Sequence, residues 1–265
     1  MNRVSMYSVQ IRRFRRVVAI GAIGVSAACG SGSAAKVQSQ QVSGESKNNM
    51  AAGKLSVARA DSAAPSTAVN ASRVPVVLFF GTSLTAGYGL NPDQAFPALI
   101  EEKARAEGTP IKAVNAGLSG ETTAGALRRI DWVLRTPADL VVIEAGANDA
   151  LRGLPTAAAK TNLEQLVAAV RQRQPQARIA LVQMEAPPNY GAAYTGSFRR
   201  IYSDVASKEG LPLLPFLLNG VAGIARLNQA DGVHPNLTGE KIVADNVWKA
   251  LKPIVIQLDR VVKSG

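Results

Sequence analysis

Three short runs made only of apolar residues place the strongest constraint on the fold of this chain. They occupy residues 76–80 (VVLFF), 140–143 (LVVI) and 179–182 (IALV), and a weaker run covers 111–114 (IKAV). Runs of this length without polar alternation are typical of strands buried on both faces of a parallel sheet. The sequence therefore predicts a parallel sheet built from these four segments.

Longer segments with helical spacing lie between and after these runs. Their apolar residues recur every three or four positions, which gives each helix one apolar face. Alternating strands and helices imply right-handed crossovers, with helices on both faces of the sheet. We expect one α/β domain over residues 73–258, followed by a short tail over 259–265. The predicted helical faces are Phe96, Leu99, Ile100 and Ala104; Leu127, Ile130, Val133 and Leu134; Leu163, Leu166, Val167 and Val170; Phe198, Ile201, Tyr202 and Val205; and Ile242, Val243, Val247 and Leu251.

The first 28 residues predict a secretory signal peptide. They carry five arginines and no acidic residue, and the apolar run VVAIGAIGVSAA closes the segment at 17–28. A basic flank, an apolar run of about 7–15 residues and small residues at its end define such signals. The run is also shorter than the about 20 residues that span a bilayer. The alternative for this segment is a buried N-terminal helix, and the Arg12-Arg13 pair is weak evidence for twin-arginine export.

The lone cysteine, Cys29, stands at the end of the apolar run in SAACG. This resembles a bacterial lipobox, although Ser26 occupies the position where leucine is usual. A lipid on Cys29 would anchor the protein to a membrane, whereas ordinary signal-peptidase cleavage near Ala28 would release it. Residues 29–72 are rich in Ser, Ala and Gly and predict a flexible tether. We therefore expect an exported protein, either a lipoprotein of the periplasm or outer membrane or a secreted form.

Composition excludes several classes of protein. One cysteine and one histidine rule out a disulfide scaffold, a cysteine-based zinc site and a multi-histidine metal site, so we expect no metal. The formal net charge of +11 suggests nucleic-acid binding, but it falls to +6 without the five arginines of the leader. With 5% aromatic residues and no basic run in the domain, we expect no nucleic-acid partner.

Polar residues follow the predicted strands at the edge where open α/β sheets bind ligands. Ser83 comes after the first strand in GTSL, and Asp231 and His234 stand in DGVHP before the last helix. A serine becomes a nucleophile when a base takes its proton, and His234 is the only histidine. Asp231 is near enough on a turn to orient the imidazole ring and leave Nε2 for the serine. These three residues form a candidate catalytic triad.

Two further segments on the same edge offer donors for an oxyanion. Asn148 lies in GAND after the run at 140–143, and Gly117 lies in NAGLSG after 111–114. A side-chain amide and a backbone N–H at a glycine are donors that acyl transfer uses. Each feature alone has a structural alternative, since Gly-x-Ser and Asp-Gly are common turns and Asn148 can cap a helix. Their joint position at the strand ends favours the catalytic interpretation.

These four segments together resemble the SGNH (GDSL-type) hydrolase superfamily over about residues 74–251. The stretch MEAPPNYGAAYTGSFRRIY at 184–202 is similar to one in the arylesterase, lysophospholipase and acyl-CoA thioesterase I branch of bacterial envelope esterases. The four family blocks appear in order as GTSLTAGYGL (81–90), NAGLSGETTAG (115–125), GANDALRGLP (146–155) and DGVHPNLTGE (231–240).

The resemblance implies a flavodoxin-like three-layer α/β/α sandwich with a mostly parallel sheet. It also implies hydrolysis of carboxylic esters or thioesters through an acyl-enzyme, with no cofactor. Ser83 matches the family nucleophile, and its N–H matches an oxyanion donor beside Gly117 and Asn148. Asp231 and His234 match the paired acid and base of the last block.

One residue departs from the family pattern. The first block normally reads Gly-Asp-Ser-Leu, and Thr82 replaces the aspartate here. Since Asp231 matches the acid of the triad, we expect the chemistry to survive. Thr82 keeps a hydroxyl but removes a charge beside the nucleophile. This change can alter the rigidity of the loop, the properties of the His234 imidazole or the choice of substrate.

Apolar residues beside these blocks are candidates for an acyl groove. They are Leu118, Pro188 and Tyr190, with Pro187 and Tyr194 nearby, and ordinary packing is the alternative. The branch favours acyl, aryl, thio or lysophospholipid esters as small-molecule substrates. A carbohydrate acetylesterase of the cell envelope is a related alternative. A non-catalytic envelope binding module that kept the fold is supported only by the changed first block.

Overall fold

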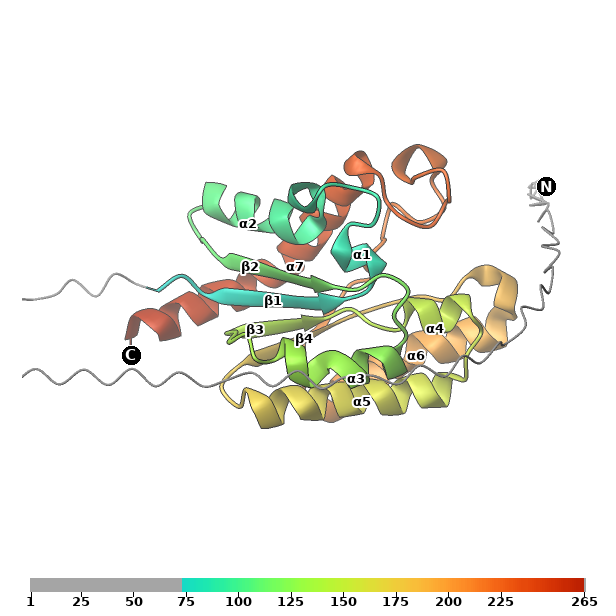
Figure 1. Cartoon of the computed structure of the whole chain (residues 1–265), viewed down its shortest axis with the longest axis horizontal. Helices are drawn as coiled ribbons and strands as arrows, with labels where there is room; N and C mark the ends of the chain where they lie inside the picture. Colours follow the sequence, from blue (N-terminus) through green and yellow to red (C-terminus); the bar gives the residue numbers. More distant parts are fainter. Residues whose placement is uncertain (1–72, 265) are drawn as a thin grey trace, which may run out of the picture. The chain divides into compact units, whose positions relative to one another are not determined.

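Five strands form one parallel sheet in the order β2-β1-β3-β4-β5 (Figure 1). The computed structural model describes residues 73–264, so the predicted signal peptide, tether and lipidated Cys29 lie outside the described residues. The strands are β1 (Val76–Gly81), β2 (Lys112–Gly117), β3 (Leu140–Ile143), β4 (Arg178–Val182) and β5 (Leu213–Leu214).

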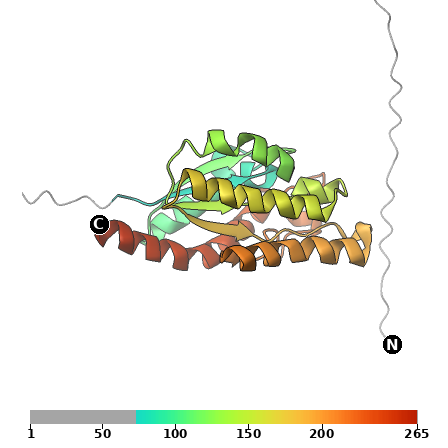
Figure 2. The ribbon, with the colours of Figure 1, turned by 90° about the horizontal axis from the view of Figure 1, so that it is seen from below.

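Helices cover both faces of this sheet. In Figure 1, α2 and α7 lie on one face and α3, α5 and α6 on the other, and Figure 2 shows α3, α5 and α6 side by side. This confirms the three-layer α/β/α sandwich. The helices are α1 (Ser83–Ala86), α2 (Phe96–Ala106), α3 (Thr123–Val133), α4 (Ala147–Leu151), α5 (Thr156–Arg173), α6 (Gly191–Glu209) and α7 (Leu237–Ser264), with 3₁₀ turns η1 (Pro92–Gln94), η2 (Pro188–Tyr190) and η3 (Ala225–Leu227).

The apolar runs form the middle of the core. The run at 140–143 coincides with β3, all four of whose residues are buried, and the run at 76–80 fills β1. The apolar face predicted at 163–170 is buried on α5. Two strands differ from expectation. Strand β2 begins and ends later than the run at 111–114 because its residues lie on the edge of the sheet and are only partly buried, and β5 has two residues, too few to form a pattern.

The predicted C-terminal tail is helical. Helix α7 runs to Ser264 and so passes the predicted end of the domain at residue 258. Pro253 lies inside the helix without ending it, and no glycine follows until Gly265. Because a glycine is the usual stop signal at a helix C-terminus, the helix has no reason to end sooner.

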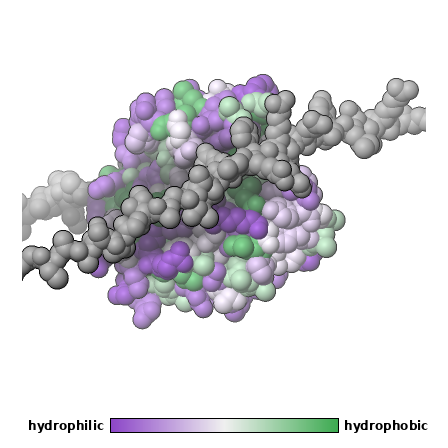
Figure 3. All heavy atoms as spheres, turned by 45° about the vertical axis from the view of Figure 1, so that its right-hand side comes forward, coloured by the Kyte–Doolittle hydropathy of each residue, from purple (hydrophilic) through white to green (hydrophobic). Residues whose placement is uncertain are grey.

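The carboxyl ends of the parallel strands lie along one edge of the sheet. Gly81 at the end of β1 pairs with Gly117 at the end of β2, and Phe80 pairs with Ile143 at the end of β3. The segments that follow these strands therefore meet at one edge. Among residues 73–264, no helix is both long and apolar enough to cross a membrane. On the face in Figure 3, hydrophobic residues are interspersed with hydrophilic ones.

Candidate active site

Ser83 is the first residue of the short helix α1, directly beyond β1. The Thr82 hydroxyl caps this helix by accepting a hydrogen bond from the N–H of Leu84 at 3.4 Å, and Gly87 ends it with a left-handed φ of 67°. Thr82, Ser83 and Thr85 are all buried in the turn, with Ser83 8% exposed. The sheet and the cap thus hold the Ser83 hydroxyl at the edge where the strands end.

The structure brings Ser83, His234 and Asp231 together in one chain of hydrogen bonds. His234 Nε2 lies 2.9 Å from Ser83 Oγ, and His234 Nδ1 lies 2.7 Å from Asp231 Oδ2. The other carboxylate oxygen, Asp231 Oδ1, accepts from the N–H groups of Val233 and His234 at 2.9 and 3.0 Å. Gly232 supplies the left-handed φ of 70° that this turn needs. The arrangement leaves Nε2 directed at the serine.

The Asp231 carboxyl is held in its ionised form. Partial burial by itself would raise its pKa, but the hydrogen bonds from the His234 ring and from the two backbone N–H groups outweigh that effect and lower the pKa to about 2. An ionised carboxylate at Nδ1 favours the tautomer in which Nδ1 carries the proton and Nε2 accepts one.

Tyr88 and Gln229 also contact the histidine, and neither was among the site residues predicted from the sequence. The Tyr88 ring packs against the His234 ring, and the Gln229 N–H donates to the His234 carbonyl at 2.7 Å. Gln229 Nε2 donates to the carbonyl of Tyr88 at 2.6 Å, which ties the two loops together. The only signal for Tyr88 was its position five residues after Ser83 in the first block.

Asn148 lies on α4 with its amide oriented by a neighbouring loop. Its Nδ2 donates to the carbonyl of Glu121 at 3.0 Å, and it is half-buried. Because a primary amide carries two N–H donors, one remains for a ligand. Gly146 is the N-cap of the helix, and its left-handed φ of 107° turns the chain from β3 into α4.

Gly117 and Gly120 differ in whether their amides are free. The Gly117 N–H already donates to Asn115 Oδ1 at 2.9 Å. A Cβ at Gly117 would lie 2.2 Å from the nitrogen of Ala86. This glycine therefore allows β2 to pack against the turn that carries Ser83. The Gly120 N–H has no partner among residues 73–264, and Gly120 is exposed with a φ of 78°. In this loop the Gly120 N–H is therefore free to donate to a ligand, whereas the Gly117 N–H is not.

A fully buried acid, Glu144, contacts the turn that carries Ser83. Glu144 Oε2 accepts from the N–H of Thr82 at 2.7 Å and from the hydroxyls of Thr82 and Thr85 at 2.9 Å each. Burial raises the pKa of Glu144, and hydrogen bonds from both threonines partly oppose this, leaving the pKa at about 7. Sequence reasoning missed Glu144 because it directly follows an apolar strand and belongs to no catalytic motif.

Two of the predicted acyl-groove residues, Leu118 and Pro188, line different cavities. Leu118 is exposed beside a cavity of about 400 Å³ that β2 and Trp132 also line. Tyr190 and Tyr194 instead donate to the carbonyls of Leu151 and Leu154 at 2.8 Å each, so both hydroxyls anchor the chain near α4.

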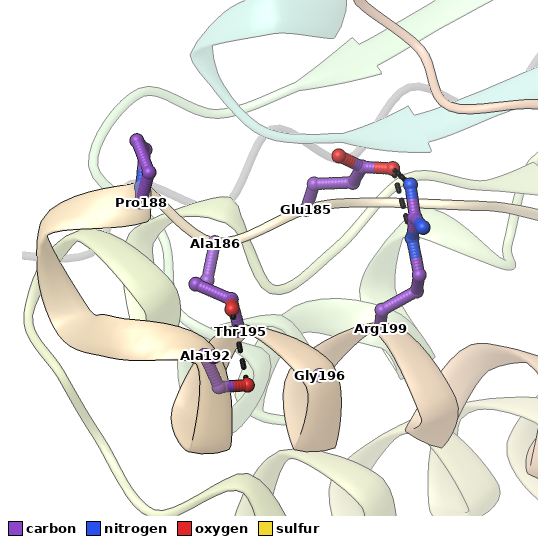
Figure 4. Close-up of a pocket in the computed structure, with 7 residues that line it drawn as sticks. All are labelled: Glu185, Ala186, Pro188, Ala192, Thr195, Gly196 and Arg199. Atoms are coloured by element: carbon purple, nitrogen blue, oxygen red, sulfur yellow. Dashed lines mark hydrogen bonds and ion pairs between the residues drawn. The ribbon is translucent and has the colours of Figure 1, made fainter. Parts of the chain in front are cut away.

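Pro188 lines a second cavity, of about 600 Å³, beyond the end of β4 (Figure 4). Small residues of α6 form one wall, and an ion pair between Arg199 and Glu185 lies at the far side from Pro188. Leu118 follows β2 and Pro188 lies beyond β4, and none of Ser83, Asp231 and His234 is among the residues that line these two cavities.

An α/β sheet with a Ser–His–Asp chain beyond its strand ends defines the serine-hydrolase class of site. The model of the GDSL-like Lipase/Acylhydrolase family matches residues 79–242, which include all three residues. The chain belongs to this family and is an ester hydrolase.

Individual relatives agree with this placement. The chain is 41% identical over 181 residues to esterase TesA of Pseudomonas aeruginosa, which covers 68% of this chain and 89% of the relative. It is 34% identical over 186 residues to thioesterase 1/protease 1/lysophospholipase L1 of Escherichia coli, covering 70% and 87%. Among solved structures, the psychrotrophic esterase EstA from Pseudoalteromonas sp. superposes with a TM-score of 0.65 at 34% identity, covering 69% of this chain and 99% of that one.

Proposed function

We propose that Ser83 is the nucleophile of a two-step acyl transfer with His234 as its base. The observation that carries this is the 2.9 Å contact between His234 Nε2 and Ser83 Oγ, within a chain that ends at Asp231. His234 takes the hydroxyl proton as Ser83 attacks the ester carbonyl, and then returns it to the departing alcohol or thiol. Water, activated by the same imidazole, releases the acid from Ser83.

The negative charge that forms on the attacked carbonyl oxygen is stabilised by hydrogen-bond donors that are already in place before the reaction. The Ser83 N–H has no partner among the described residues, and Asn148 has one N–H to spare. We assign these two donors and the free Gly120 N–H to the oxyanion hole. Gly117 then has a packing role, because its amide is already bonded to Asn115.

Acyl or aryl esters, thioesters and lysophospholipids are the substrates that we propose. The support is the similarity to an esterase, an arylesterase and a thioesterase 1/lysophospholipase L1. The cavities beside Leu118 and Pro188 offer partly apolar walls for an acyl chain or an alcohol group.

The test uses nitrophenyl esters from acetate to palmitate with the parent enzyme and its Ser83→Ala variant. Turnover in the parent that is lost in the variant supports the proposal, and the chain-length optimum separates a short-ester enzyme from a lysophospholipase-like one. Turnover confined to acetyl esters would point to an acetylesterase. A folded parent without turnover contradicts the proposal.

We also propose export, with Cys29 as the lipidated residue. The support is the basic, apolar and small-residue pattern of residues 1–28 followed by the lone cysteine. In the native host, Cys29→Ala should move the enzyme from the membrane fraction to the soluble fraction. An unchanged distribution, with no lipid mass on the parent, contradicts lipidation.

A further inference from the structure

A cavity with a basic lining lies beside the loop that carries the free Gly120 N–H. Its volume is about 350 Å³, and three of its lining residues are the arginines Arg128, Arg129 and Arg152. None of the candidate triad residues lines it, and the mechanism above gives the three arginines no role. The cavity is therefore a candidate binding site in its own right.

One of the three arginines already has an acidic partner. Arg129 Nε lies 2.7 and 2.9 Å from the two carboxylate oxygens of Glu121, and Arg129 Nη2 lies 2.7 Å from Oε2. Glu121 is buried, and the guanidinium also packs over the Phe80 ring, 4.3 Å from its centroid. Arg129 and Glu121 thus form a neutral pair in the wall of the cavity.

The other two arginines have no acidic partner among the side chains that the structure describes. Arg128 Nη1 donates to the Ala124 carbonyl at 3.3 Å, and Arg152 Nη2 donates to the Gly120 carbonyl at 3.0 Å. Each contact uses one N–H of a guanidinium group that carries five. Two positive charges with spare donors therefore line the cavity.

The cavity adjoins the proposed oxyanion hole. Asn148 lies on α4 and Arg152 caps the C-terminal end of that helix, and they donate to the carbonyls of the consecutive residues Glu121 and Gly120. Gly120 also lines the cavity, and its N–H is one of the donors that we assign to the oxyanion. An ester bound at Gly120 therefore has the two arginines beside it.

We propose that this cavity binds an anionic group of the ester substrate, a phosphate or a carboxylate, through Arg128 and Arg152. Guanidinium groups bind both oxyanions through charge-assisted hydrogen bonds, which are stronger than neutral ones. The anion belongs either to the alcohol side or to the acyl side of the ester. This inference rests on the proposed function, because it places the reacting carbonyl at Ser83 and Gly120.

The test uses two pairs of short esters, in each of which one member carries the anion and the other is neutral. The first pair is 1-hexanoylglycerol 3-phosphate and 1-hexanoylglycerol, with the phosphate on the alcohol side. The second pair is the mono-nitrophenyl ester of glutaric acid and nitrophenyl pentanoate, with the carboxylate on the acyl side. For each pair we would measure the ratio of kcat/KM for the anionic ester to kcat/KM for the neutral one.

Arg128→Gln is the main variant, because Arg152 also holds the Gly120 carbonyl and its loss would disturb the oxyanion hole. Loss of a hydrogen bond to a charged group should lower the ratio about tenfold for at least one pair. The change should lie mainly in KM of the anionic ester, because the anion is bound before and during the reaction alike.

Two controls accompany this variant. Arg128→Lys keeps the positive charge and should retain most of the preference. Arg135→Gln removes an exposed arginine just beyond the end of α3, which does not line the cavity, and should leave both ratios as in the parent.

A fall in the ratio for either pair supports the proposal, and the pair that responds shows which side of the ester carries the anion. Ratios in Arg128→Gln equal to those in the parent and in Arg135→Gln, for both pairs, would overturn it. Ser83-dependent turnover of the neutral esters in that case would leave the proposed function standing. A folded parent without turnover of any ester would overturn both proposals.

Discussion

The phenol ring of Tyr88 lies against the imidazole of His234, with the ring centroids 4.6 Å apart and the planes tilted by 39°. Tyr88 N–H donates to the Ser83 carbonyl at 3.0 Å, so the tyrosine contacts the loops of both the proposed nucleophile and its base. Tyr88 is nevertheless 52% exposed, which leaves its outer edge open to a bound ester.

Truncation of Tyr88 should weaken the placement of the base. Aromatic pairs contribute about 0.5–1.5 kcal/mol beyond burial, so Tyr88→Ala should lower kcat about 2- to 10-fold on short esters. Tyr88→Phe keeps the ring and is the matched control, with kcat expected near that of the parent. Equal kcat in the alanine variant would show that the stacking does not position His234.

Asn148 offers a sharper test of the oxyanion hole. Removal of one oxyanion donor costs about 10²–10³ in rate, so Asn148→Ala should lose that much kcat with a smaller change in KM. Asn162→Ala is a suitable comparison, because it also removes a half-buried asparagine, one that donates to Thr123 Oγ1 at 2.9 Å. A loss in Asn148→Ala no greater than in Asn162→Ala would remove Asn148 from the mechanism.

The acid of the triad should act by orienting the ring. Asp231→Asn keeps the size of the side chain but favours the wrong tautomer of His234, and a comparable change in a serine protease costs about 10⁴ in kcat. We expect a loss of about 10³–10⁴ here. Because the pKa of Asp231 is about 2, its ionisation should contribute nothing to the pH–rate profile above pH 4. A loss below tenfold in Asp231→Asn would contradict the role.

Buried carboxyls should make the protein less stable as the pH rises. Burial raises the pKa of Glu240 from 4.5 to about 8, and burial likewise raises that of Glu144 to about 7. Between these values and 4.5 the unfolded state ionises while the native state keeps its protons. The unfolding free energy should therefore fall from about pH 4.5 to pH 8, by at most about 1.4 kcal/mol per pH unit for each group.

Urea unfolding at several pH values checks this. Glu240→Gln removes one of the two groups and should flatten most of the slope between pH 7 and 8, where native Glu240 keeps more of its proton than Glu144 does. Stability that rises with pH over this range would contradict the assignment.

Strands buried on both faces were predictable because hydrophobicity alone specifies them. The run at 140–143 is β3, and the four helical residues Leu163, Leu166, Val167 and Val170 are all buried. Edge strand β2 and the two-residue β5 carry weaker patterns because partial burial relaxes the demand for apolar residues. The extension of α7 beyond residue 258 was not predicted. No glycine between Pro253 and Ser264 marks where the helix ends.

Candidate site residues were predictable where a chemical role requires a residue type. Ser83, Asp231 and His234 were singled out on that basis, and His234 lies within hydrogen-bond reach of both of the others. The residues that contact the candidate triad and its turn were not predictable, because Tyr88 and Glu144 meet partners that only the folded chain brings near. The sequence predicted Gly117 as an oxyanion donor, and our proposal of Gly120 in its place depends on the hydrogen bond from Gly117 to Asn115, which no spacing rule reveals.

Covalent trapping can show whether Ser83 is the residue that attacks the ester. The enzyme is incubated with a nitrophenyl alkylphosphonate, and the adduct is located by peptide mass mapping. We expect one phosphonyl group per molecule, on Ser83, with release of one nitrophenol, and no adduct in Ser83→Ala. An adduct on another residue, or undiminished labelling of Ser83→Ala, would contradict it.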